Sequence, residues 1–231
     1  MKLALFDLDH TLLPIDSADT WSHYLVREAG LDPDEYGARI RHFASTYRSG
    51  GFDIEAYLAF QMDLLAQFPR EELERWRDSF VREHVAPHVR SEAVQLIGRH
   101  RADGYVLALV TGTHAFLSRA IADLFGIDHL LAVRPEEADG RFTGRYVGTH
   151  TYQEGKVRAV QVFLAARGTT LADCDDSIFY SDSINDLPLL EAVAHPVVTN
   201  GDARLRAVAA QRGWPTLDLF DLVHGNGQTV K

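Results

Sequence analysis

The stretch Leu3-Ala-Leu-Phe-Asp-Leu-Asp-His-Thr11 decides the fold of this 231-residue chain. Its apolar residues 3–6 are typical of a buried strand, and they lead directly to Asp7 and Asp9. Because residues two apart in an extended chain point the same way, the two carboxylates should lie close together. Two ionised carboxylates in a poorly solvated site repel each other, so this pair needs a shared proton or a cation.

A second acidic pair follows another short apolar run far down the chain. Residues 178–180 are apolar, and Ser181-Asp-Ser-Ile-Asn-Asp186 after them carries Asp182 and Asp186. Carboxylate oxygens are hard ligands, which suit Mg²⁺ better than zinc. The two acidic pairs together therefore favour a Mg²⁺ site where two strands end.

Short β-rich runs alternate with helical patterns along much of the chain. We expect strands at residues 3–6, 105–110, 178–180 and 196–199. The helical patterns associated with the last three strands cover 115–125 (with Thr113 as its cap), 156–167 and 184–193. Alternation of strand and helix predicts an α/β fold with a Rossmann-like parallel sheet.

Two segments interrupt this alternation. Residues 14–87 show only helical signals, at 17–29, 33–47, 53–67 and 69–84, and prolines 14 and 87 mark their ends. We therefore expect a helical cap domain at 14–87, inserted into a core domain made of 1–13 and 88–231. Asp139-Gly140 lies between two β-rich runs within 130–146, as the turn of a small β-hairpin would.

Ligands of open α/β sheets gather outside the carboxyl ends of the strands, where both acidic pairs are expected. Thr111-Gly112-Thr113 follows a strand and precedes a helix, an arrangement that binds phosphate. Lys156 begins its own helix and can supply positive charge there. A phosphate, a cation and a lysine are thus expected at one corner of the sheet.

Composition narrows the class of protein. A hydrophobic fraction of 46% with 24% charged residues is that of a globular chain, and the net charge of −10 disfavours nucleic acid and anionic membranes as partners. Cys174 is the sole cysteine, which excludes an internal disulfide and a cysteine-built zinc site. No signal peptide or run of about eighteen apolar residues is visible. We expect a cytoplasmic protein, either a monomer or a homodimer.

Four motifs in this order resemble those of the haloacid dehalogenase (HAD) superfamily, closest to the phosphoserine phosphatase-like branch, subfamily IB. They are Asp-x-Asp-x-Thr at 7–11, Thr111 with Gly112, Lys156, and Asp182 with Asp186. Any one of them recurs by chance, but all four in order, each after the right element, are specific. The resemblance covers nearly the whole chain and implies the HAD fold with a helical C1-type cap.

The resemblance also implies a phosphomonoesterase that uses Mg²⁺ on a small-molecule phosphate ester. Asp7 would attack phosphorus and form a phosphoaspartyl intermediate, while Lys156 would hold Asp7 ionised. Asp9 would protonate the leaving alcohol and then deprotonate the hydrolytic water. Mg²⁺ would bridge Asp7, the main-chain carbonyl of Asp9, Asp182 and the phosphoryl group.

Other site residues follow from the same resemblance. Thr111, the Gly112 amide and Asn185 would bind phosphoryl oxygens. Asp186 would act as an indirect partner of the metal, and Thr11 would support the site from the first motif.

Substrate choice is expected to lie in the helical insert. Asp16, nine positions after Asp7, occupies the place where the phosphoserine phosphatases have an acid that faces the substrate amine. Gln61 falls where that family has an arginine for the substrate carboxylate, and glutamine lacks the charged fork of arginine. An amine-bearing monophosphate without a carboxylate fits this pattern, with histidinol phosphate first and phosphoethanolamine-like compounds next. Phosphoserine stays open if Arg39, Arg41 or Arg48 replaces the clamp.

Other interpretations remain open at this point. A receiver-like phosphoacceptor module shares the acidic pocket and lysine but lacks an acid/base at Asp9 and a cap. A phosphotransferase or mutase would use the same residues as a hydrolase, and a silent binding protein would not need every catalytic position filled. Thr113 could cap a helix or bind a ligand. The histidines at positions 10, 114 and 150 are not expected to bind a metal. Trp21, Tyr57 and Trp76 are expected in the core of the helical insert.

Overall fold

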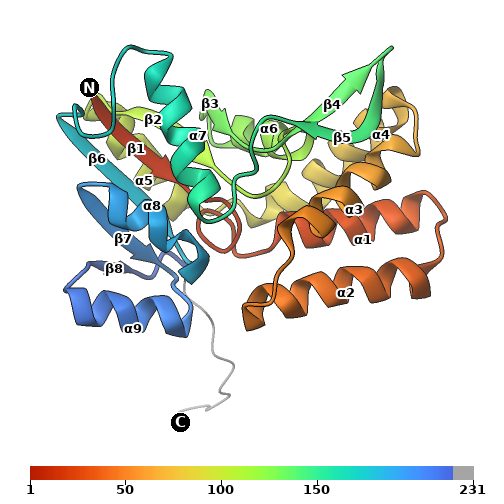
Figure 1. The fold of residues 1–231 in the computed structure, drawn as a ribbon, viewed down its shortest axis with the longest axis horizontal. Helices are drawn as coiled ribbons and strands as arrows, with labels where there is room; N and C mark the ends of the chain where they lie inside the picture. Colours follow the sequence, from red (N-terminus) through yellow and green to blue (C-terminus); the bar gives the residue numbers. More distant parts are fainter. Residues whose placement is uncertain (221–231) are drawn as a thin grey trace, which may run out of the picture.

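A computed structural model describes residues 1–220, with the side chain of Arg48 left out, and contains a six-stranded parallel sheet (Figure 1). The strand order is β3-β2-β1-β6-β7-β8, so β1 lies in the middle of the sheet. The strands are β1 (Lys2–Phe6), β2 (Val106–Val110), β3 (His129–Leu131), β6 (Asp176–Ser181), β7 (His195–Thr199) and β8 (Thr216–Leu217). The expected α/β class with a parallel sheet is confirmed.

Helices cover both faces of the sheet, which is why β1 is apolar at every position from Leu3 onward. Ala4 and Phe6 face one side, where they share a buried cluster with α5 (Ser91–Ala102) and α6 (Ala115–Leu124). Leu3 and Leu5 face the opposite side and α7 (Glu154–Ala165), α8 (Leu187–Ala192) and α9 (Ala203–Arg212). Burying each of the larger side chains, Leu3, Leu5 and Phe6, stabilises the fold by about 1.5–3 kcal/mol.

Four helices lie between β1 and β2 in the sequence, as the pattern of the insert predicts. They are α1 (Ser17–Glu28), α2 (Pro33–Ser49), α3 (Ile54–Ala66) and α4 (Arg70–Phe80), followed by a π-helical turn (Val81–Val85) and a 3₁₀ turn (Ala86–His88). Aspartates 16, 32 and 53 cap the first three through their side chains. Figure 1 shows these helices beyond the carboxyl end of β1. Trp21 and Trp76 are buried, as expected.

The hairpin consists of β4 (Arg134–Ala138) and β5 (Arg141–Val147), with the expected turn at Asp139-Gly140. Both turn residues have positive φ, as a two-residue hairpin turn requires. The predicted hairpin began too early, because residues 130 and 131 belong to β3 and pair with β2 in the main sheet. Because β3 and β4 lie in one continuous β-rich run, the sequence does not show where the main sheet ends and the hairpin begins.

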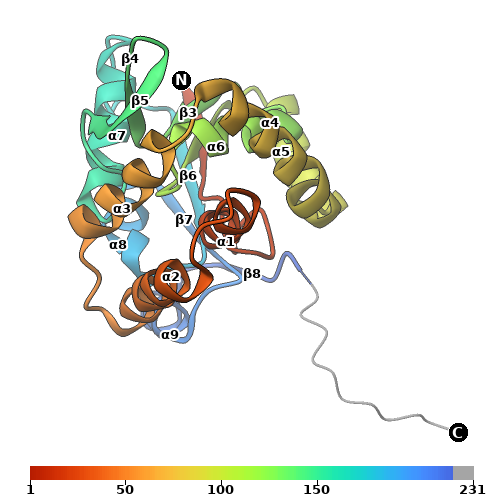
Figure 2. The same cartoon turned by 90° about the vertical axis from the view of Figure 1, so that its right-hand side faces the viewer.

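The hairpin packs on the helical insert (Figure 2). The Tyr146 hydroxyl donates to the carboxylate of Glu55 on α3 at 3.0 Å. Gly144 has φ +84°, and a Cβ there would lie 3.3 Å from Asp63 Oδ1. Glycine thus lets β5 approach α3 closely, and the hairpin links the insert to the sheet.

Several elements differ from the predicted ranges. The sequence patterns gave no helix at α5 or α9 and no strand at β3 or β8. The helix expected at 184–193 is a 3₁₀ turn (Ile184–Asp186) that continues into the short α8. Ser183 Oγ accepts the Asn185 amide, and the Ser183 carbonyl accepts the Asp186 amide at 3.0 Å, so a side chain and a backbone hydrogen bond together fix the turn.

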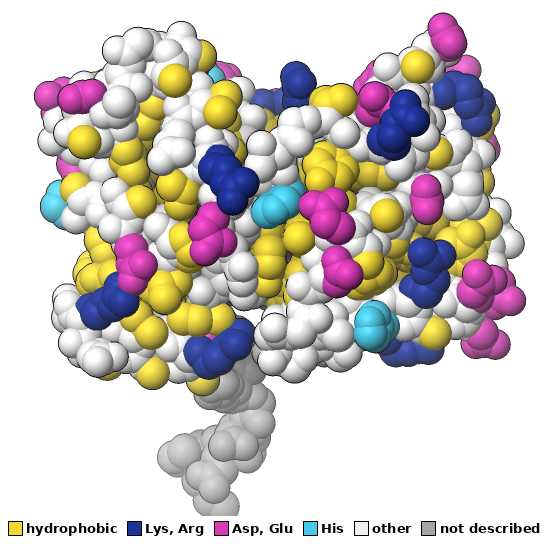
Figure 3. Space-filling model, viewed as in Figure 1, with side chains coloured by type: hydrophobic (Ala, Val, Ile, Leu, Met, Phe, Trp, Pro, Cys, Tyr) yellow, Lys and Arg dark blue, Asp and Glu magenta, His cyan; other side chains and the backbone are white. Residues whose placement is uncertain are grey.

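Charges of both signs are interspersed over the face drawn in Figure 3, where no broad basic patch gathers. That pattern agrees with the net charge of −10. Within residues 1–220, no helix is both long and apolar enough to span a membrane.

Candidate active site

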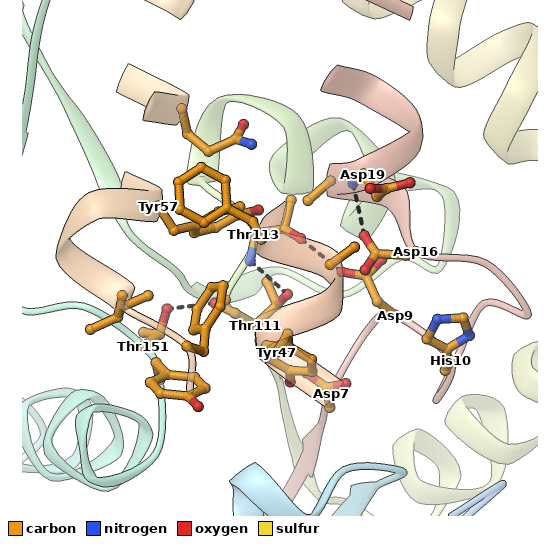
Figure 4. Close-up of a pocket in the computed structure, with 18 of the residues that line it drawn as sticks. Asp7, Asp9, His10, Asp16, Asp19, Tyr47, Tyr57, Thr111, Thr113 and Thr151 are labelled. Atoms are coloured by element: carbon orange, nitrogen blue, oxygen red, sulfur yellow. Dashed lines mark hydrogen bonds between the residues drawn. The ribbon is translucent and has the colours of Figure 1, made fainter. Parts of the chain in front are cut away.

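A pocket opens at the carboxyl ends of β1, β2 and β6, between the sheet and helices α1 to α3 (Figure 4). Most of the site residues predicted from the sequence line it together: Asp7, Asp9, Asp16, Gln61, Thr111, Gly112, Lys156, Asp182 and Asp186. Two further predicted residues do not line the pocket themselves: Thr11 is hydrogen-bonded to Asp7, and Asn185 to Tyr152, which lines the pocket. The corner predicted from parallel strand ends therefore exists.

Lys156 joins two carboxylates at the floor of the pocket. Its Nζ lies 2.7 Å from Asp7 Oδ1 and 2.6 Å from Asp186 Oδ2, and all three side chains are buried. Burial alone would lower the pKa of Lys156, but the carboxylates of Asp186 and Asp7 outweigh it and raise the pKa. Burial raises the pKa of Asp186 to about 6 despite the lysine. The lysine is therefore held as a cation beside Asp7.

A close contact at the helix start positions this lysine. A Cβ on Gly155 would lie 2.2 Å from the carbonyl oxygen of His150, so only glycine fits there. The loop before α7 therefore lies directly against the first turn of the helix. Gln153, in that loop, has φ 49°, a strained conformation of a kind that clusters at functional sites.

Thr11 connects the two acidic motifs. Its hydroxyl lies 3.2 Å from Asp7 Oδ2 and 3.1 Å from Asp182 Oδ1, and it accepts the Asp182 amide at 3.1 Å. Burial, together with repulsion from Asp7 and Asp186, raises the pKa of Asp182 well above its usual value. Lys156 neutralises Asp7 and Asp186, whereas Asp182 has no such cation among the described residues.

Asp9 is held by two donors, as Figure 4 shows in part. Its Oδ1 accepts the Ser17 amide at 2.7 Å, and its Oδ2 accepts the Thr113 hydroxyl at 2.7 Å. Burial and then repulsion from Asp16 raise the pKa of Asp9 to about 6. A carboxyl group that titrates near neutral pH can both give and take a proton.

The structure corrects the predicted helix cap at Thr113. His114 is the N-cap of α6, and its Nδ1 accepts the Leu117 amide at 3.3 Å. Thr113 instead uses its hydroxyl on Asp9, which lies more than one hundred positions earlier in the chain. Burial lowers the pKa of His114 to about 4, so its imidazole is neutral and can accept this hydrogen bond.

The turn after β2 is ordered by its own threonines. Thr111 Oγ1 accepts the Thr113 amide at 3.1 Å, and the Thr151 hydroxyl donates to the Thr111 carbonyl at 2.6 Å. The Gly112 amide has no acceptor among residues 1–220. This turn therefore offers an amide and a hydroxyl to an anion in the pocket.

Asn185 supplies another donor nearby. Its Oδ1 accepts the Tyr152 hydroxyl at 3.2 Å, which directs the amide nitrogen to the other side. Its Nδ2 is buried and has no acceptor among the described residues. Buried amide groups are nearly always paired, so a partner such as a ligand oxygen or a water is expected beside this nitrogen.

The other end of the pocket combines acids with aromatic rings. Asp16 caps α1 through the Asp19 amide at 2.8 Å, and both acids line the pocket. The surrounding protein desolvates Asp16, and Asp19 repels it, which raises the pKa of Asp16 to about 6 although water still reaches its side chain. The aromatic lining residues contributed by the insert are Phe43, Tyr47, Phe52, Tyr57 and Phe60. Tyr57, expected in the core of the insert, lines the pocket instead, because its turn of α3 faces the sheet.

The lining at this end contains no arginine among the described side chains. Arg39 lies over the ring of Phe60, with 4.5 Å between the guanidinium carbon and the ring centre, and Arg41 is exposed. The side chain of Arg48, the remaining candidate for a carboxylate clamp, is outside the described part. Gln61 does line the pocket and is buried.

Two supporting residues were missed by the sequence reasoning. Asn200 Nδ2 donates to the carbonyls of His10 and Thr11, at 2.9 and 3.3 Å, and so holds the loop after β1. Asp202 donates its amide to the Asp182 carbonyl at 2.7 Å. The signal was Asn200-Gly-Asp202 directly after β7, a polar cluster at the carboxyl end of a parallel strand.

Mg²⁺ fits the donors on the sheet side of the pocket. Within residues 1–220, no group of three or more His, Cys, Asp or Glu side chains forms a ready-made metal cluster. Mg²⁺ does not need one, because it keeps several waters and takes one or two carboxylates. Asp7 and Asp182, joined through Thr11, could provide those carboxylates. Burial, and then repulsion from Asp7 and Asp186, raises the pKa of Asp182, and a bound cation would offset that repulsion.

Comparisons with known proteins identify the family of this chain. The family model of haloacid dehalogenase-like hydrolases matches residues 4–191. A histidinol-phosphatase of Neisseria meningitidis serogroup C is 38% identical over 218 residues, 94% of this chain and 98% of that protein. A Bordetella pertussis Tohama I structure of unknown function is 44% identical with TM-score 0.90, covering 95% and 99% of the two chains. A substrate-bound phosphoserine phosphatase, 22% identical with TM-score 0.66 over 94% and 92%, shares the fold.

Proposed function

The chain belongs to the haloacid dehalogenase-like hydrolases, and we propose that it hydrolyses a small amine-bearing phosphate ester, with histidinol phosphate as the first candidate. It is a phosphoric monoester hydrolase. Its similarity to a histidinol-phosphatase over 94% of the chain supports this choice of substrate.

The substrate class is inferred from the negative charge at the end of the pocket that lies away from the phosphate-binding residues. Asp16 and Asp19 offer carboxylates there, whereas the lone lining lysine among the described residues is already shared by Asp7 and Asp186. Carboxylates attract an ammonium group and repel a substrate carboxylate. An amino alcohol phosphate therefore fits better than an amino acid phosphate.

Asp7 is the proposed nucleophile. The ion pair with Lys156 keeps Asp7 ionised and offsets charge on the incoming phosphate. Attack by an Asp7 oxygen on phosphorus would break the bond to the leaving alcohol and leave a phosphoaspartyl group, which water then hydrolyses.

Asp9 is the proposed acid and base. Ser17 and Thr113 fix its carboxyl group at the pocket wall, two residues beyond Asp7. It would donate a proton to the leaving oxygen and recover one from the attacking water.

The phosphoryl oxygens would meet donors from two loops. We assign this role to Thr111, the Gly112 amide and Asn185, whose Nδ2 lacks an acceptor in the described part. Asp7, Asp182 and the main-chain carbonyl of Asp9 would hold Mg²⁺, which supplies positive charge to the phosphoryl group when bound. Asp186 would act on that centre through Lys156.

We also propose the division into domains that the sequence suggested. Residues 14–87 would form the cap, and 1–13 with 88–231 the core domain. The position of α1 to α3 over the pocket supports a cap that shields the reaction from water.

Phosphoserine is the alternative substrate, because the chain also resembles phosphoserine phosphatases. It would need a cation for its carboxylate, and Gln61 cannot supply one. Transfer to a second alcohol, as in a mutase, uses the same residues and differs in its product.

Phosphate release in the presence of Mg²⁺ tests the proposal, with histidinol phosphate, phosphoethanolamine and phosphoserine as substrates. We expect histidinol phosphate to be preferred, with one inorganic phosphate formed per alcohol. Asp7→Asn is the blank, and Asp9→Asn should lose about 10²- to 10⁴-fold in kcat. Preference for phosphoserine would reject the substrate assignment, and alcohol formed without inorganic phosphate would indicate transfer.

A further inference from the structure

Gln61 is the least explained side chain of the pocket. It lies on α3 one helical turn after Tyr57, so both residues line the pocket from the same face of the helix. Its side chain is almost completely buried, with 3% of the residue exposed. A buried amide has two donors and one acceptor group that all need partners.

Ser22 fixes the orientation of this amide. The Gln61 Nε2 lies 2.9 Å from Ser22 Oγ, and the Ser22 hydroxyl donates its proton to the Ala18 carbonyl at 2.8 Å. With that proton used, Ser22 can only accept from Gln61, so the nitrogen of the amide faces Ser22. The carbonyl oxygen, Oε1, is buried and has no donor among the described residues.

Aromatic rings form the pocket wall on the same side. The ring centres of Phe43 and Tyr57 are 5.5 Å apart, those of Phe52 and Tyr57 5.2 Å, and those of Phe43 and Phe60 5.5 Å. Together with Tyr47 they make a continuous apolar surface. Such a surface favours a flat ring, which it can stack against or meet at an edge.

We propose that Gln61 selects a substrate whose leaving alcohol carries a nitrogen heterocycle, by accepting a hydrogen bond at Oε1 from a ring N–H held against the aromatic wall. The inference rests on the proposed function and refines it. The substrate ammonium pairs with Asp16, and the ring donor, at the other end of the alcohol, pairs with Gln61. Gln61 therefore favours a particular substrate through a hydrogen bond, in addition to lacking the charge that an arginine would offer to a carboxylate.

The chemistry of Oε1 disfavours a carboxylate, an alkyl group or a second ammonium group at this position. A carboxylate has no proton to donate to a carbonyl oxygen, and an alkyl group would leave that oxygen unpaired. A second ammonium group would gain more from the two carboxylates on α1 than from a neutral amide. A ring N–H offers one donor on a flat apolar body, which matches both features of the wall.

The test compares two esters that differ only in the ring. Histidinol phosphate has a ring N–H, whereas phenylalaninol phosphate keeps the amine and the phosphate but has a phenyl ring. We expect the wild-type enzyme to prefer histidinol phosphate by about tenfold or more in kcat/KM, the value of one good hydrogen bond. Gln61→Met, which removes the acceptor at similar volume, should bring the two esters within about twofold of each other.

Gln67→Met is the matched control, because Gln67 ends the same helix, is exposed and lies outside the pocket lining. It should keep the wild-type ratio. If Gln61→Met does not fold by circular dichroism, Gln61→Leu replaces it; leucine also removes the acceptor and should likewise bring the two esters within about twofold of each other.

The outcomes separate the two proposals. Equal losses on both esters in Gln61→Met, or no wild-type preference between them, overturn the role of Gln61 while the phosphatase assignment stands. If wild-type protein with Mg²⁺ releases phosphate from p-nitrophenyl phosphate but from neither amine ester, the proposed substrate class fails, and the inference fails with it.

Discussion

The residues around Lys156 differ in how far the sequence reveals them. Asp7, Asp9 and Asp182 could be predicted as neighbours, because each follows a strand of one parallel sheet and parallel strands end at the same edge. The role of Thr113 could not be assigned from the sequence, because its hydroxyl could either cap α6 or bind Asp9. Only the folded chain brings Asp9 near it. Spacing along the chain determines which residues reach the carboxyl edge of the sheet, and tertiary contacts determine which partners they bind there.

Lys156→Met should destabilise the protein strongly. The change leaves Asp7 and Asp186 buried without their shared cation, and removal of one partner from a buried ion pair typically costs about 3–5 kcal/mol. Urea unfolding at pH 7 without Mg²⁺ measures the difference. Lys156→Met/Asp186→Asn should recover part of the loss, and exposed Lys2→Met is the control. Wild-type stability in Lys156→Met would show that the carboxylates are solvated or protonated.

The raised pKa of Asp16 predicts a pH effect on amine substrates. Desolvation, then repulsion by Asp19, puts this pKa at about 6, so Asp16 becomes neutral as the pH falls through 6 and loses its attraction for an ammonium group. The kcat/KM for phosphoethanolamine, relative to Asp16→Asn, should therefore fall between pH 7 and 5. Asparagine keeps the helix cap and removes the charge. A ratio that stays constant with pH would mean that Asp16 does not bind the amine.

At the scale of elements, the helical insert and its end residues could be read from the sequence. Aspartate N-caps and prolines mark α1 to α3, and these signals are local. The link between β5 and α3 could not be read, because it depends on Gly144 meeting a helix about eighty residues earlier. The sequence does not predict the contact between the α2–α3 connection and the core domain either. There the ring centre of Phe52 lies 5.3 Å from that of Tyr152.

This contact predicts that the insert acts as a lid over the pocket. Phe52 and Tyr47 reach from the insert to the loop before α7 and to Ser183, whose Oγ lies 3.3 Å from the Tyr47 hydroxyl. Phe52→Ala removes the pair with Tyr152, worth about 0.5–1.5 kcal/mol, and should shift the lid toward the open state. It also removes the contacts of this ring with Phe43, Tyr47 and Tyr57 inside the insert. Limited proteolysis at residues 49–53 should become several-fold faster than in the wild type.

Orthovanadate with Mg²⁺, as a phosphate analogue, should protect the wild-type connection more than that of Phe52→Ala. Phe68→Ala is the matched control, because Phe68 packs on Trp76 within the insert and outside the pocket lining. Cleavage rates that do not respond to the analogue would argue against lid motion.

At the scale of the whole molecule, the class of the sheet could be predicted but its strand order could not. Alternating strands and helices specify parallel pairing, whereas the place of β1 between β2 and β6 depends on which crossovers bury the most apolar surface. The short edge strands β3 and β8 have too few residues to show a pattern. The central strands, which carry the acidic motifs, are the ones that the sequence reveals.

The concentration of acids at that central edge predicts that Mg²⁺ stabilises the whole fold. Asp182 approaches Asp7 and Asp9 only in the folded chain, so the ion should bind the folded state preferentially. At about tenfold above its Kd it would add about 1.4 kcal/mol, or about 3–5 °C in Tm for a chain of this size. Thermal unfolding with MgCl₂, against KCl of equal ionic strength, measures this shift. Asp182→Asn should lose the response while exposed Asp128→Asn keeps it, and an equal shift in both variants would place the ion elsewhere.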